Sequence, residues 1–422
     1  MRGDRVAPAR SPRIRPMVSR DPADLVVVGA GTVGGWASVF ARESGVERVV
    51  VVERDLVGQG ASSRAAGMVR AQGGSPDTVR LGAWSIGFYE GQAERYAADS
   101  GFVARGYVIL ASSAADERAA RDRIEMQRAT GLDARWVDAG EVSALIPAMA
   151  GGSGFRGGSF VPTDGWVDPP RNVRAYTLAM RAADVDVREQ VEFTGLRTRP
   201  GGGGRRVVTA VETTSGTIQT SRVLLTGGPA LQAVAKAAGA RAWVGYARHQ
   251  VVVTEPSDAL DADTTAMAFD IGAGIYWRPE EGGFLWGMSN PLEEPGPGRS
   301  IDWTYLRRME RRLHRLAPAT KTLGIKKAWA ATIEYTPDHL PLAGPLVLTD
   351  GTEVEGASIA GASGHGMMWG PAVSRIAIDL AVAGRTEIVE HADRLRMDRF
   401  DAKGRSPYVD PIALPFPVKV DG

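Results

Sequence analysis

The stretch LVVVGAGTVGGWASVF, residues 25–40, decides the fold of this chain. Its first four residues, Leu25–Val28, are apolar and predict a buried strand, and the glycines after them predict a tight turn. Trp36–Ser44 then has helical spacing, and the apolar run Val49–Val52 predicts a second buried strand. The order strand, glycine turn, helix, strand predicts a βαβ unit of a Rossmann-type, α/β nucleotide-binding domain.

The turn carries the residue pattern that binds a dinucleotide. Gly29 makes the tight turn, Gly31 lets the backbone approach a pyrophosphate, and Gly34 allows close packing of helix on strand. The helix N-terminus supplies the positive end of a dipole. Glu53 ends the second strand, where an acid accepts both ribose hydroxyls and disfavours a 2′-phosphate. The neighbouring residues expected to contact the dinucleotide are Thr32, Val33 and Arg54.

The segment GASSRAAGMVR, residues 60–70, narrows the choice of dinucleotide. Ser62, Ser63 and Arg64 offer donors to a diphosphate, and the small residues after them allow a flat ring to lie on the backbone. The residues expected to meet that ring are Ala66, Gly67 and Met68. A plain NAD-dependent dehydrogenase has no use for such a segment. The alternative is that it forms a Gly/Ser-rich surface loop.

Composition and charge exclude several other classes of protein. The chain has 422 residues, 44% of them hydrophobic, which is enough for two domains of ordinary size. Its formal charge of +1 favours neither nucleic acid nor anionic lipid, and its apolar runs are too short to cross a membrane. The absence of cysteine excludes disulfides, thiolate catalysis, Cys-ligated zinc and iron–sulfur clusters, and no metal site is indicated. We expect small-molecule partners and, by exclusion, a cytoplasmic location.

Four stretches in order give the chain a family resemblance. The GxGxxG unit and GASSRAAGMVR are followed by DGWVDPPRNV at 164–173 and by a pair near the carboxy terminus, TPDHLPLAGP at 336–345 and GASGHGMMWGPA at 361–372. In this combination the chain resembles the D-amino-acid oxidase superfamily of FAD enzymes from about residue 24 to about residue 390. Sarcosine oxidase beta subunits and dimethylglycine-dehydrogenase-like proteins are the members that it resembles most.

The resemblance implies that FAD is the cofactor and adds residues to its expected site. In the family, the helix after the second carboxy-terminal motif points its N-terminus at the pyrimidine edge of the isoalloxazine, where its dipole stabilises reduced flavin. Val191 stands where relatives read the adenine, and Leu-Thr-Gly-Gly at 225–228 replaces the usual Ala-Ala-Gly-Ala behind the phosphates. The cofactor residues added in this way are Val191, Thr226, Gly227, Gly361, Gly364, His365, Gly366, Met367 and Met368. The alternative for His365 is a structural role, in which a histidine in a glycine-rich turn only forms a hydrogen bond with the backbone.

The expected organisation is a discontinuous FAD-binding domain with an antiparallel-sheet (α+β) substrate domain inserted. The short apolar run Val223–Leu225 predicts a strand that returns to the first domain, and 246–287 alternates as antiparallel strands do. We assign 23–105, 150–240 and 328–395 to the FAD-binding domain and 106–149 and 241–327 to the substrate domain. Residues 1–22 are expected to be a disordered extension and 396–422 a C-terminal tail that is Pro-rich from Ser406 onward.

The chemistry that the resemblance implies is oxidation of the C–N bond of an amine. A neutral secondary or tertiary amine, or an N-methyl amino acid, would present a C–H to flavin N5, transfer a hydride and leave an imine that hydrolyses. The residues expected to line the catalytic pocket are Arg70, Tyr246, Arg248, His249, Tyr276, Arg278 and His365. Each also has a simpler structural interpretation: Arg248 and Arg278 as solvated strand residues, for example, and Tyr246 as a half-buried aromatic.

The position that binds a substrate carboxylate in glycine-oxidising relatives is changed here. Their arginine in a GLRPxTPD-like stretch is replaced by Ile333 in ATIEYTPD. Arg70, Arg248 or Arg278 would therefore have to bind a carboxylate, unless the substrate is a larger amine without one. Glu334, in the same stretch, would either bind a cationic amine or face solvent.

The electron acceptor and the partners stay open at this point. No lysine lies between Lys236 and Lys321 to assist reaction with oxygen, so the acceptor is either O2 or another carrier. A homo-oligomer, a beta-like subunit that needs a partner chain, and an enzyme for a carrier-bound amine all agree with the resemblance. Without cysteine, a covalent flavin link would require histidine or tyrosine.

Overall fold

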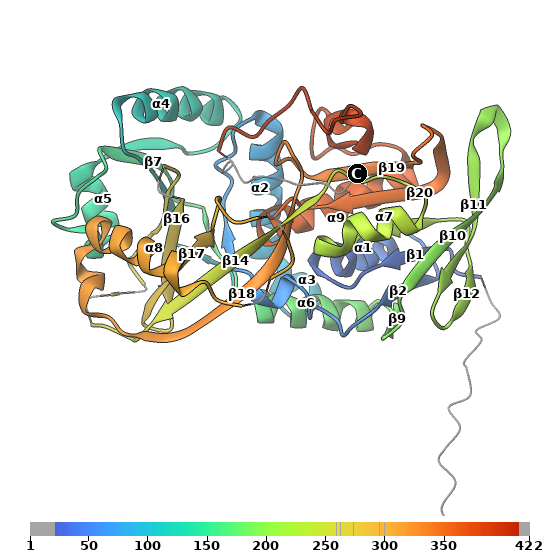
Figure 1. Ribbon diagram of the computed structural model, residues 1–422, viewed down its shortest axis with the longest axis horizontal. Helices are drawn as coiled ribbons and strands as arrows, with labels where there is room; N and C mark the ends of the chain where they lie inside the picture. The colour runs from blue at the N-terminus through green and yellow to red at the C-terminus, as the bar shows by residue number, and fades with distance from the viewer. Residues whose placement is uncertain are drawn as a thin grey trace, which may run out of the picture.

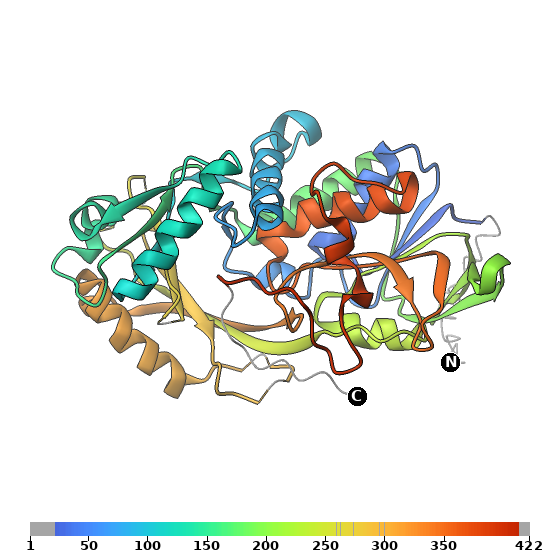
Figure 2. The same ribbon diagram turned by 90° about the horizontal axis from the view of Figure 1, so that it is seen from above.

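The computed structural model describes residues 22–258, 260–261, 263–272, 274–294, 296–298 and 300–412. The expected N-terminal extension, apart from Pro22, and the expected tail beyond residue 412 lie outside the described residues. Two large sheets lie side by side along the long axis of the molecule, each with its own helices (Figures 1 and 2). None of the described helices is long and apolar enough to span a membrane.

The first sheet contains nine of the described strands and is built around β1. Its order is β10 (Phe193–Pro200), β11 (Arg206–Thr213), β20 (Glu353–Gly361), β13 (Val223–Leu225), β1 (Leu25–Val28), β2 (Val49–Glu53) and β9 (Asp186–Glu189), with β12 (Gly216–Gln219) beside β11 and β19 (Leu342–Val347) beside β20. β1 pairs in parallel with both β2 and β13. The predicted βαβ unit and the predicted return of the chain at Val223–Leu225 are therefore confirmed.

Both faces of β1 are buried, as is typical of a central parallel strand. Leu25 and Val27 face a core formed with α1 (Thr32–Glu43), α2 (Pro76–Glu90), α6 (Pro169–Ala182) and α9 (Gly366–Ala383). Val26 and Val28 face the other core, which includes α7 (Leu231–Ala237) and the β10–β11 hairpin. Helix α1 begins at Thr32, before the predicted Trp36, because the last glycines of the turn already have helical geometry.

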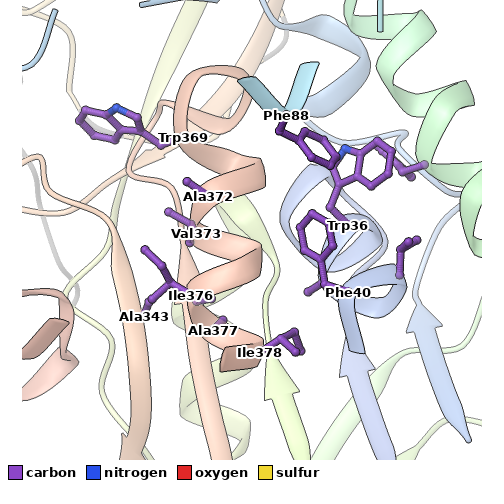
Figure 3. Packing of buried hydrophobic residues seen from close by; sticks show 14 of the residues in the cluster. Trp36, Phe40, Phe88, Ala343, Trp369, Ala372, Val373, Ile376, Ala377 and Ile378 are labelled. Atoms are coloured by element: carbon purple, nitrogen blue, oxygen red, sulfur yellow. The ribbon is translucent and has the colours of Figure 1, made fainter. Parts of the chain in front are cut away.

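Aromatic packing fixes α1 against its neighbours. Trp36 and Phe40 on α1 meet Phe88 on α2, and the apolar residues of α9 lie beside them (Figure 3). The ring centroids of Trp36 and Phe88 are 4.8 Å apart at an interplanar angle of 82°, an edge-to-face pair. The N-termini of α1 and α9, on which the site depends, are thus held by one continuous core.

The second sheet contains eight of the described strands. Its order is β18 (Ile325–Tyr335), β14 (Gly245–Thr254), β17 (Gly283–Ser289), β16 (Ile275–Glu280), β15 (Met267–Asp270), β5 (Tyr107–Ala111), β7 (Gly157–Val161) and β6 (Arg135–Asp138). All neighbours are antiparallel except β5 and β15, which confirms the predicted antiparallel strands within 246–287. One face packs on α8 (Trp303–Leu316) and α5 (Ala139–Leu145), and the other face turns toward the first sheet.

A small third sheet joins two sequence motifs. β8 (Gly165–Trp166) pairs with β3 (Met68–Val69) and with β4 (Val103–Ala104). The remaining described α-helices are α3 (Gln92–Tyr96) and α4 (Ala114–Ala129). The domain boundaries stay a prediction. β7 and most of β18 pair in the second sheet although their residues were assigned to the FAD-binding domain, since pairing over long sequence separations leaves no local signal.

Candidate active site

A cavity of about 870 Å³ runs from the first sheet to the second. The turn between β1 and α1 lines one part of it, and side chains of the second sheet, among them Tyr107 and Tyr276, line another. We call the first part the glycine end and the second part the second-sheet end. Segments far apart in the sequence meet between them, namely residues 65–68, 331–335 and 360–368.

At the glycine end the backbone leaves no room for side chains. A Cβ on Gly34 would overlap the carbonyl oxygen of Gly29 and lie 2.8 Å from Thr226 Oγ1. Gly29 has φ +94°, which an L side chain rarely adopts. The Ser62 hydroxyl accepts a hydrogen bond from the backbone N–H of Thr32 at 2.9 Å. A backbone surface and a helix N-terminus are thus exposed to the cavity, the arrangement that binds a diphosphate.

The carboxylate of Glu53 is fixed at the end of β2. Its Oε2 accepts the backbone N–H of Ala30 at 2.7 Å, and its Oε1 accepts the backbone N–H of Asp55 at 2.9 Å. Glu53 and Arg54 both line the cavity. The carboxylate therefore lies beside the glycine turn at the end of β2, the position from which an acid accepts ribose hydroxyls in dinucleotide-binding domains.

The loop of residues 60–70 closes the cavity from one side. Gly67 has φ +82°, and a Cβ there would overlap the carbonyl oxygen of Val167. The backbone N–H of Val167 in turn donates to the Gly67 carbonyl at 2.8 Å, which ties this loop to the DGWVDPPRNV motif. Arg64 lines the cavity, but its guanidinium donates to the carbonyls of Gln59 and Gly60 in its own loop.

The DGWVDPPRNV motif supports the site without lining it. Asp168 caps α6 by accepting the Arg171 N–H at 2.9 Å. Asn172 accepts a hydrogen bond from Trp36 Nε1 at 3.1 Å and donates to Thr32 Oγ1 at 3.2 Å. The motif therefore positions the first turn of α1.

The N-terminus of α9 also faces the cavity. Gly364, with φ +77°, lies against the ring of Tyr335, and His365 precedes the first helical residue. The Nδ1 of His365 lies 2.7 Å from the carbonyl oxygen of Ser363, so this nitrogen carries the proton and donates it. Burial, together with the charge of Arg70, lowers the pKa of His365 to about 3, and the ring is neutral near pH 7. His365 thus both binds backbone and lines the cavity.

A hydrogen-bonded pair faces the cavity from the second sheet. His249 Nε2 is hydrogen-bonded to the hydroxyl of Tyr276, and His249 Nδ1 lies 3.0 Å from Ser289 Oγ. The two rings are stacked, with centroids 5.5 Å apart. Burial lowers the pKa of His249 to about 4 and holds the pKa of Tyr276 well above 10, so both groups are neutral near pH 7.

Arg70 lines the cavity and is 4% exposed, and its guanidinium donates from Nη1 to the Gln72 carbonyl. Its backbone is fixed by Asp164, whose carboxyl accepts the Ala71 N–H at 2.7 Å and Gln72 Nε2 at 3.0 Å. Gln72 Nε2 also donates to the Tyr107 carbonyl at 2.8 Å. Burial raises the pKa of Asp164 to about 7, partly offset by these hydrogen bonds and by Arg70. Arg70 is therefore positioned by a buried polar network linked to β5.

Four expected site residues do not line the cavity, namely Ser63, Val191, Arg248 and Arg278. Strand alternation turns Arg248 to the face opposite His249, where it pairs with Glu293 at 2.7 Å. Arg278 is 1% exposed and donates to the Ala66 carbonyl at 2.7 Å and to Glu280 at 2.6 Å. The backbone N–H of Val191 donates to Glu53 O, and the neighbouring residues Glu192 and Phe193 line the cavity instead. The other expected residues all line it, although the Tyr246 hydroxyl is bonded to Gln232 at 3.0 Å.

Several lining residues were not expected from the sequence. They come from single positions on separate elements, namely Tyr107, Phe269, Met288, Tyr335, His339 and Ile412. The sequence gives no signal for Tyr107 and Phe269, because β5 and most of β15 are apolar on both faces. Their common face follows from the pairing of β5 with β15. Glu334, for which two roles were open, lines the cavity at 7% exposure, and burial raises its pKa to about 7.

The glycine end fits the adenosine diphosphate half of FAD. Gly34 admits no side chain, Ser62 and Thr32 stand at a helix N-terminus, and the Glu53 carboxylate is already oriented. The segments 65–68 and 360–368 offer mostly small residues and backbone to a flat ring. Among the described residues, no cluster of three His, Asp or Glu would hold a metal ion.

Comparisons with known proteins agree with this geometry. A family profile described as FAD dependent oxidoreductase matches residues 24–380. The chain is 26% identical to mitochondrial sarcosine dehydrogenase of Mus musculus, over 86% of this chain and 40% of that protein. It is 23% identical to 4-methylaminobutanoate oxidase (formaldehyde-forming) of Paenarthrobacter nicotinovorans, over 85% and 43%. The chain thus spans about two fifths of the length of these relatives.

The fold also has a close counterpart among solved structures. L-proline dehydrogenase from P. horikoshii superimposes with a TM-score of 0.80 at 23% identity, covering 90% of this chain and 98% of that one. This likeness confirms the expected fold of a Rossmann-type sheet with a second, mainly antiparallel sheet.

Proposed function

Since the chain belongs to the FAD dependent oxidoreductase family, we propose that it oxidises the C–N bond of a secondary or tertiary amine, in particular an N-methyl amino acid. FAD, when bound, supplies the acceptor for the hydride. The glycine turn, Glu53 and the loop at 60–70 would hold it, and the N-terminus of α9 would face its ring. The chain's own side chains bind and orient the amine.

The observation that carries the proposal is the composition of the second-sheet end. It combines one buried guanidinium, Arg70, with neutral imidazoles and aromatic rings. A guanidinium binds a carboxylate with paired hydrogen bonds. Arg70 donates to the backbone carbonyl of Gln72, whereas Arg248 is already paired with the carboxylate of Glu293 and Arg278 with that of Glu280. Arg70 therefore binds the substrate carboxylate, the role of the arginine that glycine-oxidising relatives have at the position of Ile333.

The same end favours the neutral form of an amine. An ammonium ion is destabilised in a buried, weakly polar site, so its pKa falls on binding. The His249–Tyr276 pair is neutral, and since both ring nitrogens of His249 already have partners, the Tyr276 hydroxyl is the group that offers a hydrogen bond, rather than charge, to the amine or to water. A lone pair on nitrogen is needed before a hydride can leave the adjacent carbon, and these residues make it available.

Names of relatives support this substrate class. Sarcosine dehydrogenase and 4-methylaminobutanoate oxidase are both named for N-methyl amino acids. The electron acceptor is O2 or another carrier. The greater length of the relatives agrees with a partner domain or subunit that acts in addition to the described residues.

The test is anaerobic mixing of the FAD-bound protein with sarcosine, N,N-dimethylglycine, proline and 4-methylaminobutanoate, followed by flavin absorbance. Bleaching of the flavin band by at least one N-methyl amine, with release of an aldehyde, is expected. Recovery of the band in air would identify O2 as the acceptor. A flavin band that none of these amines bleaches, while dithionite does, would contradict the proposal.

A further inference from the structure

The residues that follow α9 return to the cavity rather than leaving the fold. After α9 the chain passes through η6 (Ala392–Leu395) and η7 (Met397–Arg399). Its red end in Figure 2 lies between the parts of the molecule built on the two large sheets. Ile412 is 1% exposed and lines the cavity. From the sequence, the part of this stretch from residue 396 onward was expected only to belong to a C-terminal tail.

This segment is anchored on the TPDHLPLAGP motif. Arg399 and Asp338 form a two-pronged ion pair, with Nε–Oδ2 at 2.7 Å and Nη2–Oδ1 at 2.9 Å, and both side chains are 2% exposed. Farther along, the backbone N–H of Asp410 donates to the Asp338 carbonyl at 3.0 Å. The backbone N–H of Ile412 then donates to Asp410 Oδ1 at 3.1 Å. One aspartate therefore holds the segment at both ends.

The anchor places Ile412 in the apolar wall of the second-sheet end. It belongs to one buried cluster with Tyr107, Phe269, Tyr276 and Met288, which line the same cavity. An isoleucine side chain offers shape but no hydrogen bond. It therefore limits the size of a bound group without orienting it, whereas Arg70 orients by charge.

We propose that Ile412 determines substrate specificity by setting the size of the amine substituent that the second-sheet end accepts. This proposal rests on the proposed function, because it assumes that the substrate occupies this end. The substrate class that follows is an amino acid with a small N-substituent and a small side chain. Removing carbons from Ile412 opens the wall to larger groups, and adding a ring closes it.

The test uses Ile412→Ala, Ile412→Val and Ile412→Phe in the full-length, FAD-bound protein. The readout is the ratio of kcat/KM for N-benzylglycine to that for sarcosine. Since a single methylene in an apolar pocket changes discrimination by about 10- to 200-fold, Ile412→Ala should raise the ratio at least about 10-fold. Ile412→Val should raise it less, and Ile412→Phe should lower it.

A control and a second readout separate this proposal from the proposed function. Val409, on the same segment but 66% exposed, gives the matched control Val409→Ala, for which no change is expected. Dissociation constants of acetate and phenylacetate, measured from the perturbed flavin spectrum, require no turnover. If no amine is oxidised but Ile412→Ala still lowers the dissociation constant of phenylacetate relative to that of acetate, only the proposed function fails. If folded Ile412 variants leave both ratios at the wild-type value, the specificity proposal is wrong.

Discussion

The two ends of the cavity are built in different ways. The glycine end consists of backbone from a few continuous segments, with glycines where a Cβ would overlap a neighbour. The second-sheet end consists of single side chains from β5, β14, β15, β16, β17, β18 and the segment after α9, together with Arg70, which follows β3. The first end suits a large cofactor that always has the same shape. The second end can change one residue at a time, so substrate preference is adjustable without disturbing the cofactor.

The largest effect is expected at the glycine end. In Gly34→Ala the new Cβ would overlap the carbonyl oxygen of Gly29, so the turn must move away from the diphosphate. We expect FAD affinity to fall by more than about 100-fold, since overpacking costs about 1–3 kcal/mol and the displaced backbone donors are lost as well. Titration of the apoprotein with FAD, followed by flavin fluorescence, measures it.

The control for this change is Gly87→Ala in helix α2. Gly87 has no neighbouring atom within 4 Å of its added Cβ, so FAD binding should be unchanged. The helix itself should gain up to about 1 kcal/mol. Equal FAD affinity in both variants would show that the backbone at Gly34 does not shape the cofactor site.

The next effect separates two arginines that look alike in the sequence. Arg70→Gln should raise the KM for an N-methyl amino acid about 100-fold while FAD stays bound, because losing one partner of a buried charged pair costs about 2–5 kcal/mol. Arg248→Gln removes an ion pair with Glu293 outside the cavity and should change KM less than about 3-fold. Steady-state kinetics with matched FAD content measure both. A larger effect at Arg248 than at Arg70 would contradict the assignment.

A smaller effect is expected from the hydroxyl of Tyr276. Tyr276→Phe removes the partner of His249 Nε2. The change should lower kcat about 10-fold, because that factor corresponds to the net free energy of roughly one hydrogen bond. Tyr305→Phe removes a hydroxyl bonded to the Ser289 carbonyl at 2.7 Å outside the cavity, so its kcat should stay near wild type. Rapid-reaction reduction of the flavin measures the step directly. Equal rates in both variants would remove the pair from the mechanism.

The smallest effect on turnover is expected for Glu334→Gln. This substitution instead changes how the free energy of unfolding depends on pH. Its pKa is raised from 4.5 to about 7 by burial, so the folded protein retains a proton that the unfolded chain has released. The stability from this group is complete below pH 4.5 and is lost as pH rises through about 7. The Glu334→Gln variant lacks this contribution. Between pH 5 and pH 8 its free energy of unfolding should therefore fall by about 1–3 kcal/mol less than that of the wild type. Urea unfolding of the apoprotein at both pH values measures it, and parallel losses would contradict it.

The sequence predicts the glycine end well and the second-sheet end in part. GxGxxG and Glu53 are local patterns with a fixed geometry, so their placement follows once the strand and helix are recognised. Arg248 and His249 are adjacent, and only the pairing of β14 decides which of them faces the cavity. Ile412 could not be predicted, because its place depends on an ion pair between Asp338 and Arg399, 61 residues apart. Contacts across such separations leave no periodic signal in one sequence.

The most direct test of a single cavity that holds FAD at one end and the substrate at the other is a crystal structure. The FAD-bound protein would be crystallised with (methylthio)acetate, a carboxylate that carries no oxidisable amine. We expect the diphosphate at the turn of Gly29–Gly34, the flavin ring against residues 65–68, and the ligand carboxylate on the Arg70 guanidinium. A carboxylate bound away from Arg70, or a flavin ring outside the cavity, would contradict this arrangement.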